Sequence, residues 1–538
     1  MKKKSSMISL KNPFQHVLPR LVIFFVFLVG TWIIMTSSDY IHKSVSAMQA
    51  PAREANDALN FNPPMAGDPD SVMAAGFSID DDLTGNSGQT TDLLPGITGE
   101  HTGRTANLDQ ADANSNMMIP ARSNSSESRN QTEKRDKEQD LAEMNRFEAG
   151  AFEDPENCEM CHQEIFDAWS QSKHRYAWEN IFYQPDYIQA SRESEGFTDI
   201  FCGECHAPIG VRTGQLPPPD GSQMDETSRK GVSCDYCHTV KKVVRPFNVQ
   251  TISDPGDVKR GPKGDGWASY HEIEFSKIHT DPAFCGACHN VVHPTSGAPV
   301  IDTYDDWKAG PYAQEGIRCQ DCHMTPGPGV EKNPGRSSFM GEDRDHVATH
   351  FFQGGSVFFH EKMGNQQEAA LSRQMLEAAA ELETEVFRTN NGVEIIARVK
   401  NVGAGHKIPT GVTYIRKMWL EVTAKNGSGE EIFRSGHVTE SNRIDPGAKF
   451  YRKIFKDAEG NLTPKSWVAE EIGYDHRIPA KGHDEQLFRV PAVHDDDEIH
   501  VLIRLMYRSM SQEVAEGLGI EGIEVPALEM TRAELTIP

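Results

Sequence analysis

An uncharged apolar run near the start of the chain, from Leu21 to Met35, follows several lysines and an arginine. Its length lies between a signal-peptide core of about 7 to 15 residues and a membrane-spanning helix of about 20. We predict an uncleaved anchor over residues 18–37, because Ala47 and Ala50 lie too far beyond the run for a usual cleavage site; a cleaved signal peptide is the alternative. The basic segment 1–17 then faces the cytoplasm. This pattern predicts a single-pass protein of a bacterial-type inner membrane, with most of the chain in the periplasm or facing the exterior.

Residues 38–150 lack the periodic hydrophobicity of a helix or a strand. From Pro51 to about Gly150 the chain is rich in Asn, Ser, Asp, Gly and Ala and contains no Trp, Tyr or Cys. Such a stretch cannot bury enough apolar surface to offset the conformational entropy that ordering it would cost. We therefore predict a disordered acidic tether, with a partly ordered pro-region as the alternative.

Two different periodicities occur in the C-terminal part of the chain. Within residues 363–384 apolar side chains recur at steps of three and four, which predicts an amphipathic linking helix. Beyond it every second residue is apolar, and Asn426 and Gly427 supply a turn between two such runs. The helical positions are Leu371, Met375, Ala379 and Leu382, and the strand positions include Val393, Ile395, Ala397, Val399, Met418, Leu420, Val422 and Ala424. The alternation predicts a β-sandwich domain over residues 385–538.

All 10 cysteines fall in five copies of one motif, Cys-x-x-Cys-His. The copies are Cys158-Glu-Met-Cys161-His162, Cys202-Gly-Glu-Cys205-His206, Cys234-Asp-Tyr-Cys237-His238, Cys285-Gly-Ala-Cys288-His289 and Cys319-Gln-Asp-Cys322-His323. This is the attachment motif of c-type haem. Two thiols one helical turn apart can add to the two vinyl groups of one porphyrin, and the next residue then points its imidazole at the iron. We therefore predict five covalently bound haem c groups, with the motif histidines as iron ligands.

Other uses of paired cysteines fit this pattern less well. A zinc site needs four ligands and does not require a histidine after every second cysteine. Thioredoxin-like pairs do not occur five times in one chain without a βαβ context, and disulfides do not require this spacing. Because five motifs crowd into residues 158–323, the porphyrins must form much of the core. We predict a mainly α, haem-packed domain over residues 151–362 with little regular sheet.

The role of each haem depends on the far side of its iron, since a second histidine leaves only electron transfer and an empty position admits a substrate. His174 follows His162 by twelve residues, about 18 Å along a helix, so it would serve a different haem. His293 shares a helix face with His289, so it would ligate a neighbouring haem or lie at the surface.

Further histidines are available on both sides of the last two motifs. His271 and His279 precede the fourth motif, and His346, His350 and His360 follow the fifth, so some of them must be spare. His406 lies in a loop bounded by glycine and proline and is either structural or a ligand. The predicted distal ligands are His174, His279, His293, His350 and His406.

Three segments resemble the multihaem cytochrome c family related to hydroxylamine oxidoreductase and its tetrahaem electron acceptor. They are the stretch from His162 to His174, the segment Gly231-Val-Ser-Cys234-Asp-Tyr-Cys237-His238, and Thr303-Tyr-Asp-Asp-Trp307 with Gly316-Ile-Arg-Cys319-Gln-Asp-Cys322-His323-Met324.

The resemblance covers roughly residues 150–360 and carries expectations about distal ligands. It implies that His174 ligates another haem and that His350, which precedes Gly354 and Gly355, is a distal ligand. The loop around His406 resembles a segment of β-domains appended to multihaem cytochromes, which favours a ligand there. The chain departs from the family in having five motifs instead of four or eight, so no particular substrate is implied.

The net charge of -25 argues against a nucleic-acid partner, because phosphate binding needs clustered cations. It favours a basic or neutral redox partner by electrostatic steering, although an acidic surface also serves solubility alone. We predict an electron carrier that exchanges electrons with cytochromes or with quinol-linked or terminal oxidoreductases. The alternative is a reductase or oxidase of small nitrogen or sulfur compounds with one five-coordinate catalytic haem.

Overall fold

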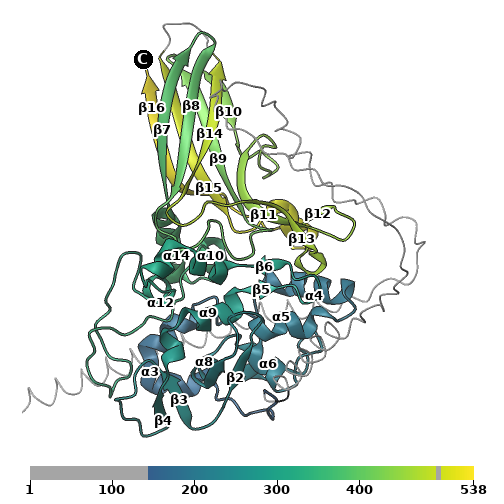
Figure 1. The fold of residues 1–538 in the computed structure, drawn as a ribbon, viewed down its shortest axis with the longest axis vertical. Helices are drawn as coiled ribbons and strands as arrows, with labels where there is room; N and C mark the ends of the chain where they lie inside the picture. The colour runs from purple at the N-terminus through teal and green to yellow at the C-terminus, as the bar shows by residue number, and fades with distance from the viewer. Residues whose placement is uncertain (1–142, 144, 492–497, 521) are drawn as a thin grey trace, which may run out of the picture. The chain divides into compact units, whose positions relative to one another are not determined.

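The computed structural model describes residues 143, 145–491, 498–520 and 522–538 (Figure 1). The predicted segments 1–17 and 18–37, and the predicted tether as far as residue 142, lie outside these residues.

The helices that carry the motifs are short, and most of them end at the motif histidine. Four helices end at His206, His238, His289 and His323, and the first is interrupted at His162 by non-helical backbone angles. Their bounds are α3 Pro155–Ser170, α5 Thr198–His206, α8 Cys234–His238, α9 Pro282–His289 and α12 Gln320–His323. Each motif therefore presents its histidine where the helix stops.

Proline and aspartate set the start of two of these helices. Asp154 accepts a hydrogen bond from the Glu156 amide, and Asp281 accepts one from the Ala283 amide. A proline follows each cap at the first helical position, where its missing N–H costs nothing. The cysteines that follow are thereby fixed in helical register.

Other short elements fill the space between the motif helices. The helices are α4 Tyr183–Glu193, α6 Pro208–Arg212, α7 Glu226–Arg229, α10 Thr303–Ala309, α11 Pro311–Gln314 and α13 Val357–Lys362, with a 3-10 turn η3 at Lys277–Thr280. Three two-stranded pairs are β1 Val240–Val243 with β2 Thr251–Ser253, β3 Val258–Gly261 with β4 Glu272–Phe275, and β5 Val291–Val292 with β6 Pro299–Ile301. The second pair is parallel.

Helix α14 Gln366–Ala379 leads directly into strands (Figure 1). A seven-stranded sheet runs β12-β11-β9-β15-β16, with β10 on β9 and β13 on β11, and a three-stranded sheet runs β14-β8-β7. The strands are β7 Ala380–Thr389, β8 Gly392–Asn401, β9 Lys417–Asn426, β10 Glu431–Ser435, β11 Lys449–Lys456, β12 Leu462–Thr463, β13 Glu471–His476, β14 His483–Pro491, β15 Ile499–Arg508 and β16 Leu528–Ile537; η4 Ser466–Val468 and α15 Gln512–Gly517 lie between them.

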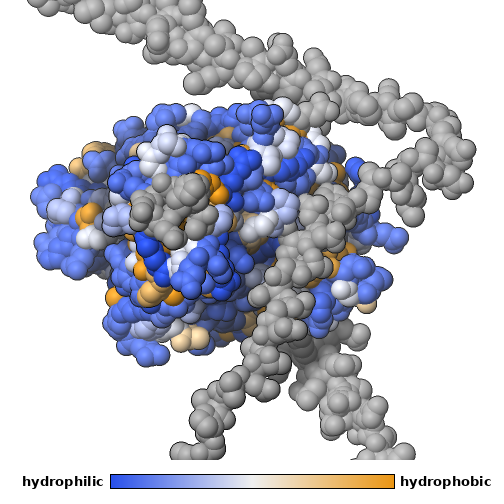
Figure 2. Space-filling model, turned by 90° about the horizontal axis from the view of Figure 1, so that it is seen from above, coloured by the Kyte–Doolittle hydropathy of each residue, from blue (hydrophilic) through white to orange (hydrophobic). Residues whose placement is uncertain are grey.

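The two sheets share one hydrophobic core. Ile395 and Val399 of β8 are fully buried with Val422 of β9 and Ile503 of β15, and the last two residues pair across the strands. Polar side chains alternate with these positions along β8, and hydrophilic residues cover most of the face seen in Figure 2. The period-two pattern of the sequence therefore places one face of each strand in the core.

The predicted fold class, a transmembrane helix, a mainly α haem-packed domain over residues 151–362 with little regular sheet, and a β-sandwich after it, is contradicted by the structure. The structure contains 28% helix and 27% strand, with a large multi-stranded sheet. The physical reason is that helices ending at a motif histidine stay short, while the alternating C-terminal strands reach ten residues in β8, β9 and β15.

The predicted single-pass inner-membrane localisation is also corrected. Throughout the part of the chain that the structure describes, no helix combines the length and the apolar character that crossing a membrane requires.

A buried ion network joins the sheet to the motif-bearing segment. Arg477 donates hydrogen bonds to Asp302 at 2.8 and 3.0 Å and to Asp306 at 3.0 Å, and Lys453 donates to the Pro299 carbonyl at 2.7 Å. The side chains of Arg477 and Lys453 are fully buried. Burial alone would raise the pKa of Asp302, but the hydrogen bond from Arg477 and the charge of Lys453 hold it below its usual value. The network fixes strand ends of the sheet against the start of α10.

We predict that Arg477→Met lowers the free energy of unfolding by up to about 3 to 5 kcal/mol, because the buried Asp302 and Asp306 carboxylates lose their shared guanidinium and keep only one lysine each. Chemical denaturation of the haem-loaded protein, followed by circular dichroism, measures this change. Arg398→Met is the control, since Arg398 of the central strand β8 pairs with the more exposed Glu385 and Glu485 on the outer face of the three-stranded sheet and should cost less. If both variants lost the same unfolding free energy, the prediction that the buried Arg477 network stabilises the fold more than an outer ion pair would be wrong.

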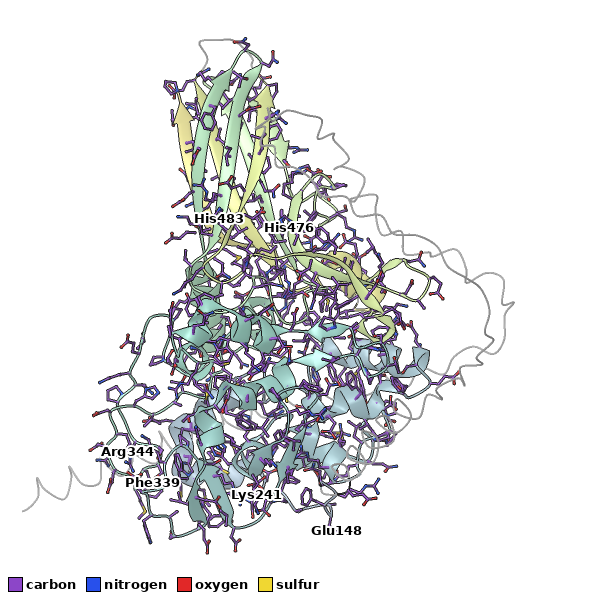
Figure 3. All side chains as sticks on the ribbon, viewed as in Figure 1. Glu148, Lys241, Phe339, Arg344, His476 and His483 are labelled. Carbon is purple, nitrogen blue, oxygen red and sulfur yellow. The ribbon has the colours of Figure 1, made fainter. Side chains whose placement is uncertain are left out.

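A second ionic cluster in the sheet should make stability depend on pH. His476 donates to Asp484 at 3.0 Å, and Asp484 also accepts from Tyr451 at 3.2 Å (labelled His476 in Figure 3). The hydrogen bond with Asp484 raises the pKa of His476 above its ordinary value of 6.5. For Asp484, burial raises the pKa, but the hydrogen bonds from His476, Gln486 and Tyr451 together outweigh burial, and the pKa falls below 3.8.

A raised histidine pKa stabilises the fold below pH 6.5, and the stabilisation is lost as the pH rises through the folded-state pKa. A lowered aspartate pKa stabilises the fold above pH 3.8, and this stabilisation is lost as the pH falls through the folded-state pKa. We therefore expect His476→Gln to cost more unfolding free energy at about pH 5.5 than at about pH 8.5. Denaturation at both pH values, with exposed His483→Gln as control, measures it; a pH-independent cost would refute the assignment.

Candidate haem sites

The motif histidines are held with one ring nitrogen fixed and the other available. Backbone carbonyls lie close to Nδ1 in four of them, and a carbonyl can only accept, so Nδ1 carries the proton and Nε2 keeps its lone pair. The distances are 2.5 Å from His162 to Ser337, 2.8 Å from His206 to Ala177, 2.6 Å from His238 to Arg260 and 2.6 Å from His323 to Gln353. This is the tautomer that ligates a metal through Nε2.

Four of the five motif histidines face a second imidazole. An imidazole nitrogen binds a first-row metal at about 2 Å, so two rings on opposite sides of one iron have centroids about 6 to 6.5 Å apart. The centroid distances are 6.3 Å for His162 and His271, 6.2 Å for His289 and His174, 6.3 Å for His238 and His350, and 6.4 Å for His323 and His406. These four gaps fit an iron with two histidine ligands.

Each pair joins parts of the chain that are distant in sequence. Of the predicted distal ligands, the structure brings His174, His350 and His406 to motif histidines at this spacing. It also brings His271 to His162, which the sequence prediction had left unassigned. His271 lies next to β4, and nothing in the sequence distinguished it from His279, eight residues later.

The other two predicted distal ligands are placed differently. The Nε2 atom of His279 lies 3.2 Å from the Cys237 carbonyl, and its ring centroid is 5.2 Å from that of His238, closer than an iron between the rings allows. For His293, Nε2 donates to the Trp467 carbonyl at 3.1 Å and Nδ1 lies 3.1 Å from the Thr295 hydroxyl. Both ring nitrogens of His293 are thus used in hydrogen bonds.

His206 has an aromatic neighbour in place of an imidazole. The Tyr183 ring stacks on His206 with centroids 3.6 Å apart and an angle of 3° between the planes. Trp178 and Tyr187 pack around this tyrosine, whose hydroxyl is buried without a hydrogen-bond partner. No histidine of the described residues stands opposite His206 at the spacing of the four pairs.

Burial also keeps these imidazoles neutral, as metal ligation requires. Desolvation lowers the pKa of His174 to about 3 and that of His206, His289, His350 and His406 to about 4.

The loop that carries His406 is clamped from both sides. Asn401 donates to the His406 carbonyl at 2.8 Å and to the Ile478 carbonyl at 3.2 Å. A Cβ at Gly403 would meet the Ala378 carbonyl oxygen at 2.1 Å, so only glycine fits there. Tyr312 of α11 donates to the Val402 carbonyl at 2.9 Å. The sheet thus presents the His406 ring to that of His323.

Cysteines of different motifs lie close together, although all 10 are free of disulfides. Side-chain contacts join Cys158 with Cys234, Cys205 with Cys288, and Cys285 with Cys319. The first motif therefore adjoins the third, and the fourth adjoins both the second and the fifth. Cys237 of the third motif also lies within electrostatic range of Cys288. Groups attached at these sulfurs would be near neighbours.

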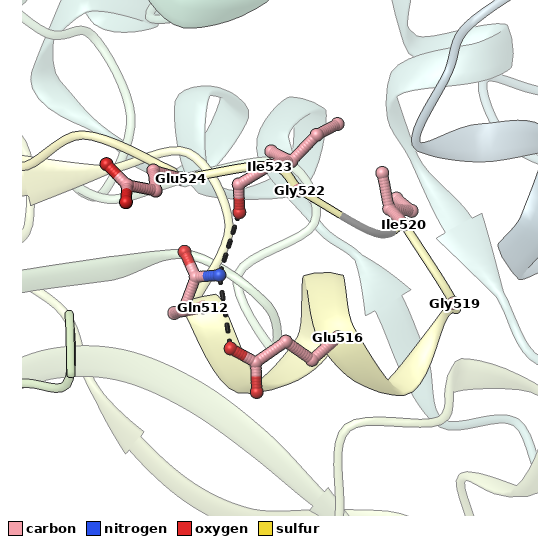
Figure 4. A pocket seen from close by; sticks show the side chains of 7 residues that line it. All are labelled: Gln512, Glu516, Gly519, Ile520, Gly522, Ile523 and Glu524. Atoms are coloured by element: carbon pink, nitrogen blue, oxygen red, sulfur yellow. Dashed lines mark hydrogen bonds between the residues drawn. The ribbon is translucent and has the colours of Figure 1, made fainter.

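A shallow hollow beside α15 contains none of these residues (Figure 4). Gln512 spans it by donating to Glu516 at 3.2 Å and to the Ile523 carbonyl at 2.8 Å. It has no feature that binds haem.

Two comparisons match this chain to known proteins. The family model described as cytochrome c554 and c-prime matches residues 157–239, a segment that contains the first three motifs. The crystal structure of a penta-heme cytochrome c552 from Thermochromatium tepidum is 19% identical, with a TM-score of 0.51, and the match covers 73% of this chain and 100% of that chain. No curated protein matches the chain.

The structural match extends beyond the motif-bearing segment, because residues 151–362 are too few to make up 73% of the chain. It therefore concerns the fold of the sheet as well. Neither match shows a specific relation to hydroxylamine oxidoreductase. Together with the five motifs, they support a multihaem c-type cytochrome with covalently bound haem c and a role in electron transfer.

Proposed function

We propose that the chain carries five haem c groups, one on each motif, and that it moves electrons between redox proteins. Bound haem supplies an iron that gains and loses one electron; the protein attaches it, ligates it and excludes water. The single observation that carries the proposal is the set of four imidazole pairs with centroids 6.2 to 6.4 Å apart.

In this proposal four haems have two histidine ligands, which fill the iron and leave electron transfer as the chemistry. The pairs are His162 with His271, His238 with His350, His289 with His174, and His323 with His406. His279 and His293, expected as ligands from the sequence, have no such role.

The cysteine contacts support an order for electron transfer. The first and third motifs adjoin, the third lies near the fourth, and the fourth adjoins the second and the fifth. Electrons that enter at the first haem would pass the third and reach the fourth, where the route divides. Residues 151–362 act as the haem domain, residues 363–384 as a link, and residues 385–538 as a sheet domain that completes the fifth haem.

One observation favours a second candidate function, the reduction or oxidation of a small nitrogen or sulfur compound. His206 faces no imidazole among the described residues, and the buried Tyr183 hydroxyl beside it has no partner. An open iron position opposite His206 can bind a small ligand. In this reading the other four haems supply electrons to the site at His206.

We predict four low-spin irons and one high-spin iron in the haem-loaded protein. Electron paramagnetic resonance counts the two kinds, and carbon monoxide added to the reduced protein should shift about one fifth of the Soret absorbance, because only an open position binds it. No shift would rule out the catalytic candidate and leave a pure carrier. A shift in two or more haems would contradict the proposed pairs.

Two histidine substitutions test the choice between His271 and His279. His271→Ala should create one additional high-spin, carbon-monoxide-binding haem, because it removes the ring opposite His162. His279→Ala, the matched control eight residues away, should leave the number of low-spin irons unchanged. The same count by paramagnetic resonance measures both, and the reverse outcome would assign His279 to the iron.

A further inference from the structure

A buried polar cluster lies between α13 and α14, outside the haem sites. His360 of α13 and Glu368 of α14 are each fully buried, with His360 Nε2 and Glu368 Oε1 3.7 Å apart. Ser372, one turn after Glu368, is fully buried as well. Neither ring nitrogen of His360, neither carboxyl oxygen of Glu368 and not the Ser372 hydroxyl has a hydrogen-bond partner.

Five unpaired polar atoms in one buried place call for an explanation, because each costs free energy when it makes no hydrogen bond. A charged carboxylate would be costlier still, so the pair is most stable when it is neutral. Burial raises the pKa of Glu368 to about 8 and lowers that of His360 to about 3. The acid therefore changes charge near neutral pH.

The cluster adjoins the segment that leads into a proposed iron ligand. Asn365, between the two helices, donates to the Gln171 carbonyl at 3.1 Å. The Lys173 ammonium lies 4.0 Å from the centroid of the Phe359 ring, directly before His360 in α13. Lys173 precedes His174, and its charge acts on both His360 and His206. His360 of the pair and the motif histidine His206 thus share one charged neighbour, Lys173.

Other charged and titratable groups around the pair differ from it in exposure or in partner. Glu361 and Arg373, sequence neighbours of His360 and Ser372, form an ion pair at 3.3 Å with both side chains 42% exposed. Lys362 lies over the Phe358 ring at 5.5 Å. From the sheet, the Tyr507 hydroxyl is buried beside Gly355.

We propose that His360 and Glu368 form a proton-binding site that gains a proton when a neighbouring haem is reduced and releases it on reoxidation. A one-electron donor supplies the electron to the ferric iron, and solvent supplies the proton, which forms one O–H or N–H bond on the pair. A unit charge added at about 12 Å changes a proton affinity about tenfold where the effective dielectric constant is about 20. By linkage, the protonated pair in turn makes the haem easier to reduce.

The proposal rests on haems occupying the motif sites, and its test is a reduction titration of the haem-loaded protein at several pH values between about 6 and 9. The midpoint of at least one haem should fall as the pH rises, by at most a tenfold change in the reduction equilibrium per pH unit. Glu368→Gln should flatten this dependence, because the amide cannot exchange a proton. Glu361→Gln, the exposed neighbour, should keep it.

A wild-type slope in Glu368→Gln would overturn the proposal. If that variant does not fold, Glu368→Leu provides the same test, because leucine cannot exchange a proton either, and a retained slope there has the same meaning. The low-spin count of each variant separates this inference from the proposed function: a normal count with a lost slope supports the proton site, and a normal count with a retained slope refutes it. An abnormal count in the wild type contradicts the proposed haem ligation whatever the slope.

Discussion

The distance that an iron imposes on two imidazoles is the constraint on which the rest of the proposed structure depends. Each facing pair connects segments far apart in sequence, such as His162 with His271 and His323 with His406. Short helices that end at a motif histidine cannot form a large core by themselves. In the proposed structure, the facing imidazoles and the haems between them would hold distant segments together, as the packing of long helices does in an ordinary α-helical domain.

The sheet contributes to this arrangement by position more than by chemistry. Its own core is a conventional packing of Ile, Val and Leu between two layers. The His406 loop brings its ring opposite the motif histidine His323, and the buried Arg477 network ties the sheet to the segment that carries the motifs. A fold likeness that covers 73% of the chain is understandable if motif-bearing segment and sheet form one working unit.

The features that sequence could predict are those with a local signature. The haem motifs can be recognised from five consecutive residues, and β8 can be predicted from the alternation of Val393, Ile395, Ala397 and Val399 with other residues. The share of helix was misjudged because crowded motifs suggest helices without revealing that four of the five motif helices end at the motif histidine. The structure places His271 opposite His162 and directly before β4, and the parallel pairing of β3 with β4 leaves no mark in the nearby sequence.

The clamp on the His406 loop has a consequence for the order in which the protein matures. Asn401 reaches the Ile478 carbonyl, and Ile408 pairs with Ile478, so the loop takes its final form only after more than 150 residues beyond the last cysteine have been synthesised. A haem joined to Cys319 and Cys322 would have to wait for this part of the chain before its second ligand arrives. Of the four irons that would have two histidine ligands, the iron at the fifth motif would therefore be the last to gain its second ligand during biogenesis.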